Sequence, residues 1–189
     1  SKPDLPLEKI VTEVLYIPDR EENSPFDNDR IKWAIIEYGG VHTSMRFEDH
    51  YHNFNTNSYY CYYDNGQRKS NHSVVIVGWD DNYPADKFSV SPPGDGAFIV
   101  RNSWGPEWGE DGYFYVSYYD KIIGINNTVY TNVVEPDEYN NIYQYDELGW
   151  TGDTMGYKDE IAWGANVFEC KDENELLDAV SFYTNTERT

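Results

Sequence analysis

Two stretches of the chain each join an apolar, β-branched run to a polar side chain that can take part in catalysis. His72 opens the first run, at residues 72–77, and Asn102 directly follows the second run, at residues 97–101. Such runs, bounded by glycine and polar residues, are typical of buried strands. If the two strands pair antiparallel, the start of the first lies beside the end of the second. We therefore expect His72 and Asn102 to meet at one edge of a sheet.

This pairing has a chemical meaning for the imidazole. A histidine works as a general base when a partner on its other ring nitrogen holds one tautomer, and the side-chain carbonyl of Asn102 can be that partner. Trp104, two residues further on, could lie over the pair and keep water from it. The alternative is structural: His72 is a core histidine at a strand start, and Trp104 and Trp108 are ordinary core aromatics.

The same residues resemble the His and Asn blocks of papain-like cysteine peptidases, and residues 78–81 and 117–120 resemble the prokaryotic branch. The resemblance rests on Asn71-His72-Ser73-Val74, on Val77-Gly78-Trp79, and on Asn102-Ser103-Trp104-Gly105 followed by Trp108 and Gly112-Tyr113. It implies peptide-bond hydrolysis by a thiolate, with no cofactor and no metal.

The resemblance also implies roles for single residues. His72 is the catalytic base and Asn102 orients it. Trp104 shields their contact and is expected on the substrate side of the site. A looser match over residues 27–47 places Ser44 and Ser73 at the pocket for the substrate residue second from the scissile bond.

The nucleophilic cysteine departs from the family pattern. The family has it upstream, near Gln-Gly and before a Trp, whereas the two cysteines here, Cys61 and Cys170, lack that context. Because the chain starts without a Met or a signal segment, we expect it to be the C-terminal part of a longer enzyme and inactive alone. The alternative is a degenerate, non-catalytic homologue that acts as a glycan- or cell-surface-binding module.

Composition limits the partners. The 189 residues include 34 acidic and 14 basic side chains, a net charge of −20, and 17% are aromatic. Phosphates would be repelled, which argues against nucleic acid as a partner. The aromatic content supplies enough apolar surface for a folded core. No run approaches the roughly 18 apolar residues of a membrane span.

The remaining pattern predicts a fold that is α+β and mostly β. Residues 1–26 are an extended lead-in with one strand. A helix is expected over 27–40, with a buried stripe formed by Ile31, Ala34, Ile35 and Tyr38. Strands are expected over 41–47 and 112–119, and two short strands over 122–134 about the turn pair Asn126-Asn127. Residues 80–96 are an irregular connection.

Residues 48–71 are polar and rich in tyrosine, which predicts a long surface loop or hairpin. Asp49, His50 and His52 lie close together there. Without a cysteine or a third histidine in register, such a cluster is typical of a solvated loop rather than a metal site.

The composition shifts after residue 134, and this predicts two domains. By the resemblance, residues 1–134 correspond to the second, β-barrel-like domain of the papain-like fold. Residues 135–189 are expected to be a smaller, incomplete β unit with strands over 141–145, 161–168 and 177–183 and a helical turn at 173–176. That unit resembles the lectin-like β-sandwich of some prokaryotic papain-like peptidases. The partners expected are a peptide or protein substrate, the Cys-bearing N-terminal half, and a carbohydrate, for a secreted or cell-surface protein.

Overall fold

A computed structural model describes residues 9–21, 24–63, 69–135, 141–144 and 164–180 of the chain. The chain divides into two units, one formed by residues 14–131 and the other by residues 1–13 together with 132–189. Strand β1 (Ile10–Ile17) and strand β8 (Ile125–Val134) each cross that boundary. The residues discussed as a site all belong to the first unit.

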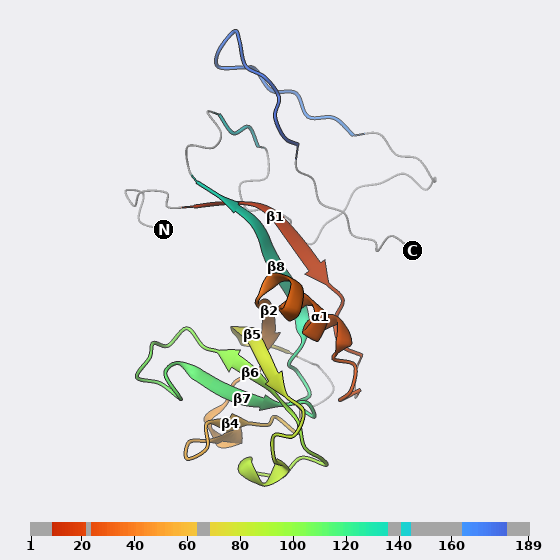
Figure 1. Ribbon diagram of the computed structural model, residues 1–189, viewed down its shortest axis with the longest axis vertical. Coiled ribbons are helices and arrows are strands. Elements are labelled where there is room, and N and C mark those ends of the chain that lie inside the picture. Colours follow the sequence, from red (N-terminus) through yellow and green to blue (C-terminus); the bar gives the residue numbers. More distant parts are fainter. Residues whose placement is uncertain (1–8, 22–23, 64–68, 136–140, 145–163, 181–189) are drawn as a thin grey trace. The chain divides into compact units, whose positions relative to one another are not determined.

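An eight-stranded sheet dominates the described residues, in the order β1-β8-β2-β5-β6-β7-β4-β3 (Figure 1). The strands of its middle are β2 (Val41–Met45), β5 (His72–Asp80), β6 (Ala97–Arg101) and β7 (Tyr113–Ser117). Two short strands, β4 (Ser58–Tyr59) and β3 (His52–Asn53), complete it, and β4 runs parallel to β7. With a single α-helix in the described part, the expected α+β, mostly β fold class is confirmed.

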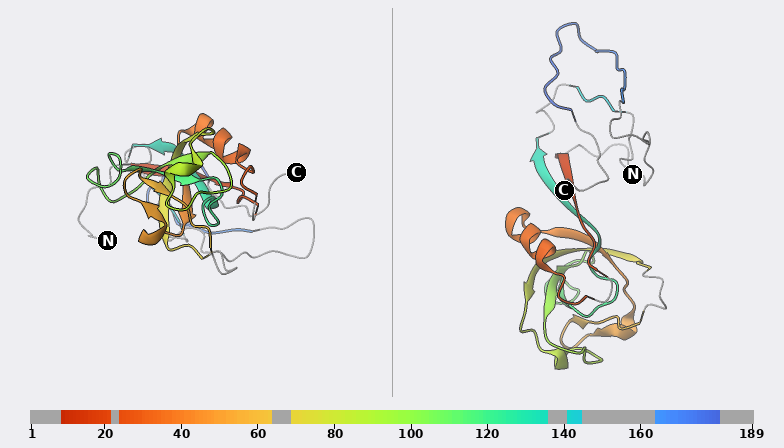
Figure 2. Two further views of the ribbon diagram at one scale, coloured as in Figure 1. Left: turned by 90° about the horizontal axis from the view of Figure 1, so that it is seen from below. Right: turned by 90° about the vertical axis from the view of Figure 1, so that its right-hand side faces the viewer.

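Helix α1 (Asp29–Tyr38) lies against β2 and β5 (Figure 1, Figure 2). Ile31, Ala34 and Ile35 are buried, as expected, but Tyr38 is 37% exposed. Tyr38 is the last helical residue, and its ring packs edge-on against Trp33 at 5.7 Å instead of entering the core. The helix ends at Gly39, whose φ of 92° lets its N–H return to the Ile35 carbonyl.

Strands β5 and β6 pair antiparallel, which confirms the prediction on which the site depends. Ile76 lies opposite Val100, and Trp79 lies opposite Phe98, with a bulge between Ile76 and Gly78. One face of these strands is fully buried in the core cluster of the unit. The consequence is that the start of β5 lies beside the end of β6.

The two short strands expected over 122–134 are wrong, because the structure has one continuous strand, β8. Asn126 has a φ of 53°, and the register against β2 shifts there: His42 lies opposite Thr128, but Ser44 lies opposite Ile125. Asparagine tolerates this left-handed conformation, so the Asn-Asn pair forms a bulge inside a strand instead of a turn between two.

A long surface loop or hairpin was expected over 48–71: the hairpin is present, since β3 and β4 pair antiparallel, but the segment is not confined to the surface. The described residues contain two 3₁₀ turns, Asp49–Tyr51 and Ala85–Lys87, and the first leads into β3. Tyr51, Tyr59, Tyr60 and Cys61 are buried, because the tyrosine rings supply apolar surface to the core. The described residues of this segment therefore contribute Tyr51, Tyr59 and Cys61 to the core cluster.

The described ranges 141–144 and 164–180 carry no strand, and residues 173–174 form a turn. The strands expected there are absent from these ranges, and the rest of each lies outside the described residues. Tyr143 joins the two segments, since its hydroxyl donates to Glu175 Oε2 at 2.6 Å and accepts the Lys171 N–H at 2.7 Å. Within the described ranges, no helix has the length and apolarity that crossing a membrane requires.

Candidate active site

His72 and Asn102 meet at the edge of the sheet where β5 begins and β6 ends. The Nε2 atom of His72 lies 2.9 Å from Oδ1 of Asn102. The backbone of Asn102 is held by its own N–H, which donates to the Gly112 carbonyl at 2.9 Å, and the residue is only 7% exposed. Both partners of the contact are thus fixed by backbone that belongs to, or directly follows, the sheet.

The neighbour Ser103 decides which way the amide of Asn102 points. Its backbone N–H donates to the same Oδ1 at 2.8 Å, so the atom facing it must be the acceptor oxygen. An oxygen that accepts from Ser103 can only accept from His72 too, which makes Nε2 the protonated nitrogen of the neutral ring. The tautomer of His72 is therefore set, and the lone pair is on Nδ1.

Nδ1 is the nitrogen of His72 that remains for chemistry, since no described residue makes a hydrogen bond with it. A neutral imidazole with Nε2–H committed to an amide oxygen can take one proton at Nδ1 and later return it. The resulting imidazolium keeps its contact with Asn102. The pair thus has the form of a general base and the residue that orients it.

Aromatic rings cover this contact. The ring of Trp104 lies 4.8 Å from that of His72, centroid to centroid, at 30°, and the Trp104 side chain is 47% exposed. Trp108 packs edge-on against Trp104 at 5.1 Å and stacks on His52 at 5.4 Å. The cover is a chain of rings that runs from the solvent side of His72 into the core.

His52, the first residue of β3, lies at the buried end of this series of rings. It is 5% exposed, and neither ring nitrogen has a hydrogen-bond partner within the described part of the chain. Burial lowers its pKa, against a smaller opposing effect of Asp49. The described residues hold no group of three side chains that could bind a metal ion, and the structure uses His52 as an aromatic core residue instead.

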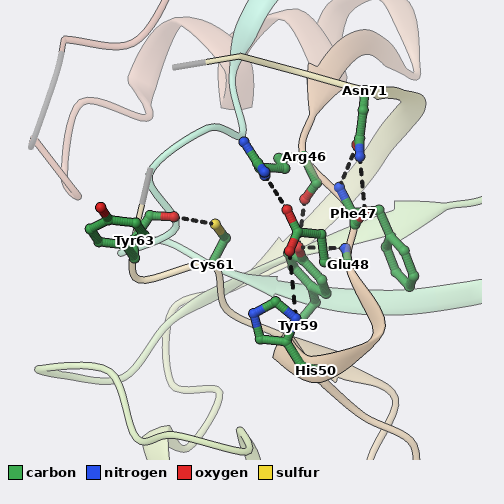
Figure 3. Close-up of polar contacts among 8 residues, drawn as sticks. All are labelled: Arg46, Phe47, Glu48, His50, Tyr59, Cys61, Tyr63 and Asn71. Atoms are coloured by element: carbon green, nitrogen blue, oxygen red, sulfur yellow. Dashed lines mark hydrogen bonds and ion pairs between the residues drawn. The ribbon is translucent and has the colours of Figure 1, made fainter. Parts of the chain in front are cut away.

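Cys61 is not placed to serve as the nucleophile. The thiol is fully buried and donates to the Tyr63 carbonyl at 3.1 Å (Figure 3). Burial, with a further contribution from the Asp120 carboxylate, raises the pKa of Cys61 to about 12. A catalytic cysteine needs a thiolate near neutral pH, which this environment opposes.

The two serines expected on the substrate side lie opposite each other, Ser44 in β2 and Ser73 in β5. Ser44 is buried, and its hydroxyl accepts from the Asn126 amide at 3.3 Å. Ser73 is exposed and lines an open pocket of about 370 Å³ beside Asn102, together with Arg101. Only Ser73 of the two is brought to a pocket next to the pair.

The comparisons with known proteins identify the family of this chain. Residues 8–133, more than half of the chain, match the family model described as papain family cysteine protease. The chain belongs to this family. Residues 142–189 match a second model, described as a lectin-like domain, so a papain-family segment is followed by a lectin-like one.

Two solved structures are similar to this chain, and the second is described as containing both kinds of domain. The chain is 32% identical to the clostridial cysteine protease Cwp84 after propeptide cleavage, with a TM-score of 0.60 over 75% of this chain and 34% of that one. It is 33% identical to the cysteine protease and lectin-like domains of Cwp84 from Clostridium difficile, with a TM-score of 0.58 over 71% of this chain and 29% of that one. That protein is described as surface layer associated.

Curated relatives include cysteine proteases of a plant and a protist. A cysteine protease of Ambrosia artemisiifolia is 31% identical over 106 residues, which cover 56% of this chain and 24% of the relative. The cathepsin B-like CP3 of Giardia intestinalis is 32% identical over 115 residues, 61% of this chain and 35% of the relative. The chain thus spans only about a quarter to a third of the length of these relatives.

The sequence analysis missed two residues that contact the site, Phe47 and Asn71. Phe47 stands at the end of a strand pattern, and Asn71 entered only as part of the His block. A signal was available: Phe47 continues the face of Val41, Thr43 and Met45 with a large aromatic ring just beyond the end of the strand. Its partners could not be inferred, because they come from three other segments.

Proposed function

We propose that this chain supplies the general base, His72, and the orienting residue, Asn102, of a cysteine peptidase. The observation that carries the proposal is the 2.9 Å contact of Nε2 with an amide oxygen whose orientation Ser103 fixes. It leaves Nδ1 to face a nucleophile. Family membership supplies the class of reaction, and neither cysteine of residues 1–189 has the setting of a nucleophile. We place that cysteine in a part of the protein outside this chain.

In the proposed reaction, Nδ1 of His72 holds the proton that the thiol gives up, and the imidazolium stabilises the thiolate. The thiolate attacks the peptide carbonyl carbon, and the carbon–nitrogen bond breaks as Nδ1–H passes its proton to the leaving amine. Water then releases the acyl group by the reverse proton path. Asn102 accepts from Nε2–H throughout, so the ring neither rotates nor changes tautomer.

The substrate-side assignments are part of the same proposal. Trp104 is half exposed next to His72, and Ser73 borders the pocket beside Asn102, so both are accessible to a peptide. Ser44 is buried beneath this surface, and in this proposal it contributes by accepting the hydrogen bond of the Asn126 side chain at the bulge of β8. We propose residues 1–134 as the peptidase domain part and residues 135–189 as the lectin-like part.

The test is complementation. The purified chain, verified by mass, is assayed on a fluorogenic peptide alone, after mixing with the Cys-bearing half, and within the full-length protein. We expect turnover only in the last two cases, and thiol alkylation should abolish it. The matched control is the same mixture with His72→Ala. Turnover by the isolated chain, insensitive to His72→Ala, would place the catalytic groups elsewhere.

The match of residues 142–189 to a lectin-like domain favours a second function for that part. We propose that it binds carbohydrate at a cell surface, in a secreted protein. A glycan array probed with the full-length protein, and with a version that ends at residue 134, tests this. Loss of all glycan signals in the shortened version is expected; equal signals from both would contradict the assignment.

A further inference from the structure

Asn71, the residue before His72, holds the backbone of Phe47 with both polar atoms of its side chain. Oδ1 of Asn71 accepts the Phe47 N–H at 2.7 Å, and Nδ2 donates to the Phe47 carbonyl at 3.1 Å (Figure 3). The backbone N–H of Asn71 also donates to the Met45 carbonyl at 3.0 Å. The segment that follows β2 is therefore tied directly to the residue that precedes the proposed base.

The ring of Phe47 reaches both the proposed base and its cover. Its centroid lies 6.0 Å from that of His72 and 4.9 Å from that of Trp104, which it meets edge-on at 87°. On its other side it stacks on Tyr59 at 5.0 Å and 18°. Tyr59 is fully buried and donates its hydroxyl to the Arg46 carbonyl at 2.6 Å, so the support under Phe47 is rigid.

Trp104 needs such support, because nearly half of its side chain is in solvent. Only a ring held in place can keep water from the hydrogen bond beneath it, and that bond is stronger where water is excluded. Phe47 abuts Trp104 at one edge and Trp108 abuts it at another. Trp108 also packs on Phe47 at 6.0 Å, but of the two rings it is Phe47 that contacts His72 as well as Trp104.

We propose that Asn71 and Phe47 form a positioning clamp, which holds Trp104 over the hydrogen bond between His72 and Asn102. Neither residue touches a reacting atom, so both act through their neighbours. The effect on turnover rests on the proposed peptidase function. The effect on the hydrogen bond is a property of this chain and can be measured without any activity.

The measurement is the exchange of the His72 Nε2 proton with water, followed by NMR in the histidine-labelled chain. Phe47→Ala removes the contacts with Trp104 and His72, and we expect exchange to be about tenfold faster, the scale of one lost aromatic contact. Asn71→Ala should shift it in the same direction by less. Phe47→Tyr, which keeps the ring, should restore the slow exchange.

The matched control is Phe26→Ala. Phe26 is 70% exposed and packs on Tyr119 at 5.9 Å, not on the rings around His72. Its loss should therefore leave the exchange rate of the His72 Nε2 proton unchanged. Each variant is checked by near-UV circular dichroism and by its denaturation midpoint. Should Phe47→Ala fail to fold, Phe47→Leu keeps most of the apolar volume without the flat ring and should still exchange faster.

Wild-type exchange in a folded Phe47→Ala or Phe47→Leu chain would overturn the clamp, as would equal acceleration in Phe26→Ala. In the complete enzyme, Phe47→Ala should lower kcat and leave KM nearly unchanged. An enzyme inactive in every form, with faster exchange still observed in Phe47→Ala, would defeat the peptidase proposal and leave the clamp standing.

Discussion

His72 and Asn102 are 30 positions apart in the chain, yet Nε2 of the first lies 2.9 Å from Oδ1 of the second. One antiparallel strand pair brings them together, because β5 begins at His72 and Asn102 directly follows the end of β6. The contact is therefore positioned by the backbone of two neighbouring strands of the sheet. The predictions that follow test the surroundings of this pair and then the pair itself.

His52 should make the stability of the fold depend on pH. Its pKa is lowered from 6.5 by burial, so between 6.5 and that lower value the unfolded chain binds more protons than the native one. The free energy of unfolding should thus fall as pH drops through this window, by about 1.4 kcal/mol per unit of pKa lowering. Urea denaturation at pH 7.5, 6.5, 5.5 and 4.5 measures it.

His52→Phe should flatten that dependence, because it keeps a ring against Trp108 and removes the titrating group. The matched control is His50→Phe. His50 is exposed and lies 3.5 Å from Glu48, outside the aromatic chain, so this variant should retain the pH dependence of the wild type. An undiminished pH dependence in His52→Phe would show that another group is responsible. His42 is the first to examine, since burial lowers its pKa as well.

Cys61 should resist alkylation in the native chain. Its thiol is buried with a pKa of about 12, whereas the Cys170 side chain is exposed. Iodoacetamide at pH 8 should therefore modify Cys170 first, and Cys61 only after denaturant is added. Peptide mapping by mass spectrometry follows both sites over time. Labelling of Cys61 at the rate of Cys170 would mean that the loop over 48–71 opens readily.

Asp120 should be a strong contributor to stability. Its Oδ2 accepts the Cys61 N–H at 2.7 Å, and its Oδ1 accepts the N–H groups of Ile122 and Ile123 at 2.9 Å each. Asp120→Ala would leave three buried donors unpaired, so we expect a loss of about 3 kcal/mol or more in the free energy of unfolding. Asp86→Ala, at an exposed position, is the control and should change it by less than about 0.5 kcal/mol.

The part of the fold that follows from local pattern was predictable. The β-branched runs before Trp79 and Asn102 indicate two buried strands, and their antiparallel pairing, which the sequence analysis took as a condition, brings His72 to Asn102. Helix α1 was predictable for the same reason, from its periodicity and from the glycines that end it. Only Tyr38 was misplaced, because a residue in the last turn is free to turn outward.

The parts that depend on distant segments were not predictable. Asn126-Asn127 suits a turn and a bulge equally, and the choice is made by β2, whose Thr43 hydroxyl donates to the Asn127 side chain at 2.7 Å. The tyrosine-rich loop looks solvated by composition, but its rings pack against Phe47 and Trp108. The aromatic cover of the site likewise joins segments that no local pattern connects.

The most direct test of the central claim is a double-mutant cycle on the complete enzyme, with kcat/KM measured for His72→Ala, Asn102→Ala and the double variant. Each variant is checked for folding by near-UV circular dichroism. Asn102→Ala should lower turnover by a part of the about 10²–10⁴-fold that general acid–base catalysis contributes, and it should leave the pH optimum nearly unchanged, because an amide does not titrate.

His72→Ala should lose more, since the proton acceptor and the counter-charge of the thiolate disappear together. If Asn102 acts through His72, the double variant should fall little below His72→Ala alone, because residues that act as a unit are not additive. If the two losses multiply instead, Asn102 does not act through His72, and the proposed site is contradicted.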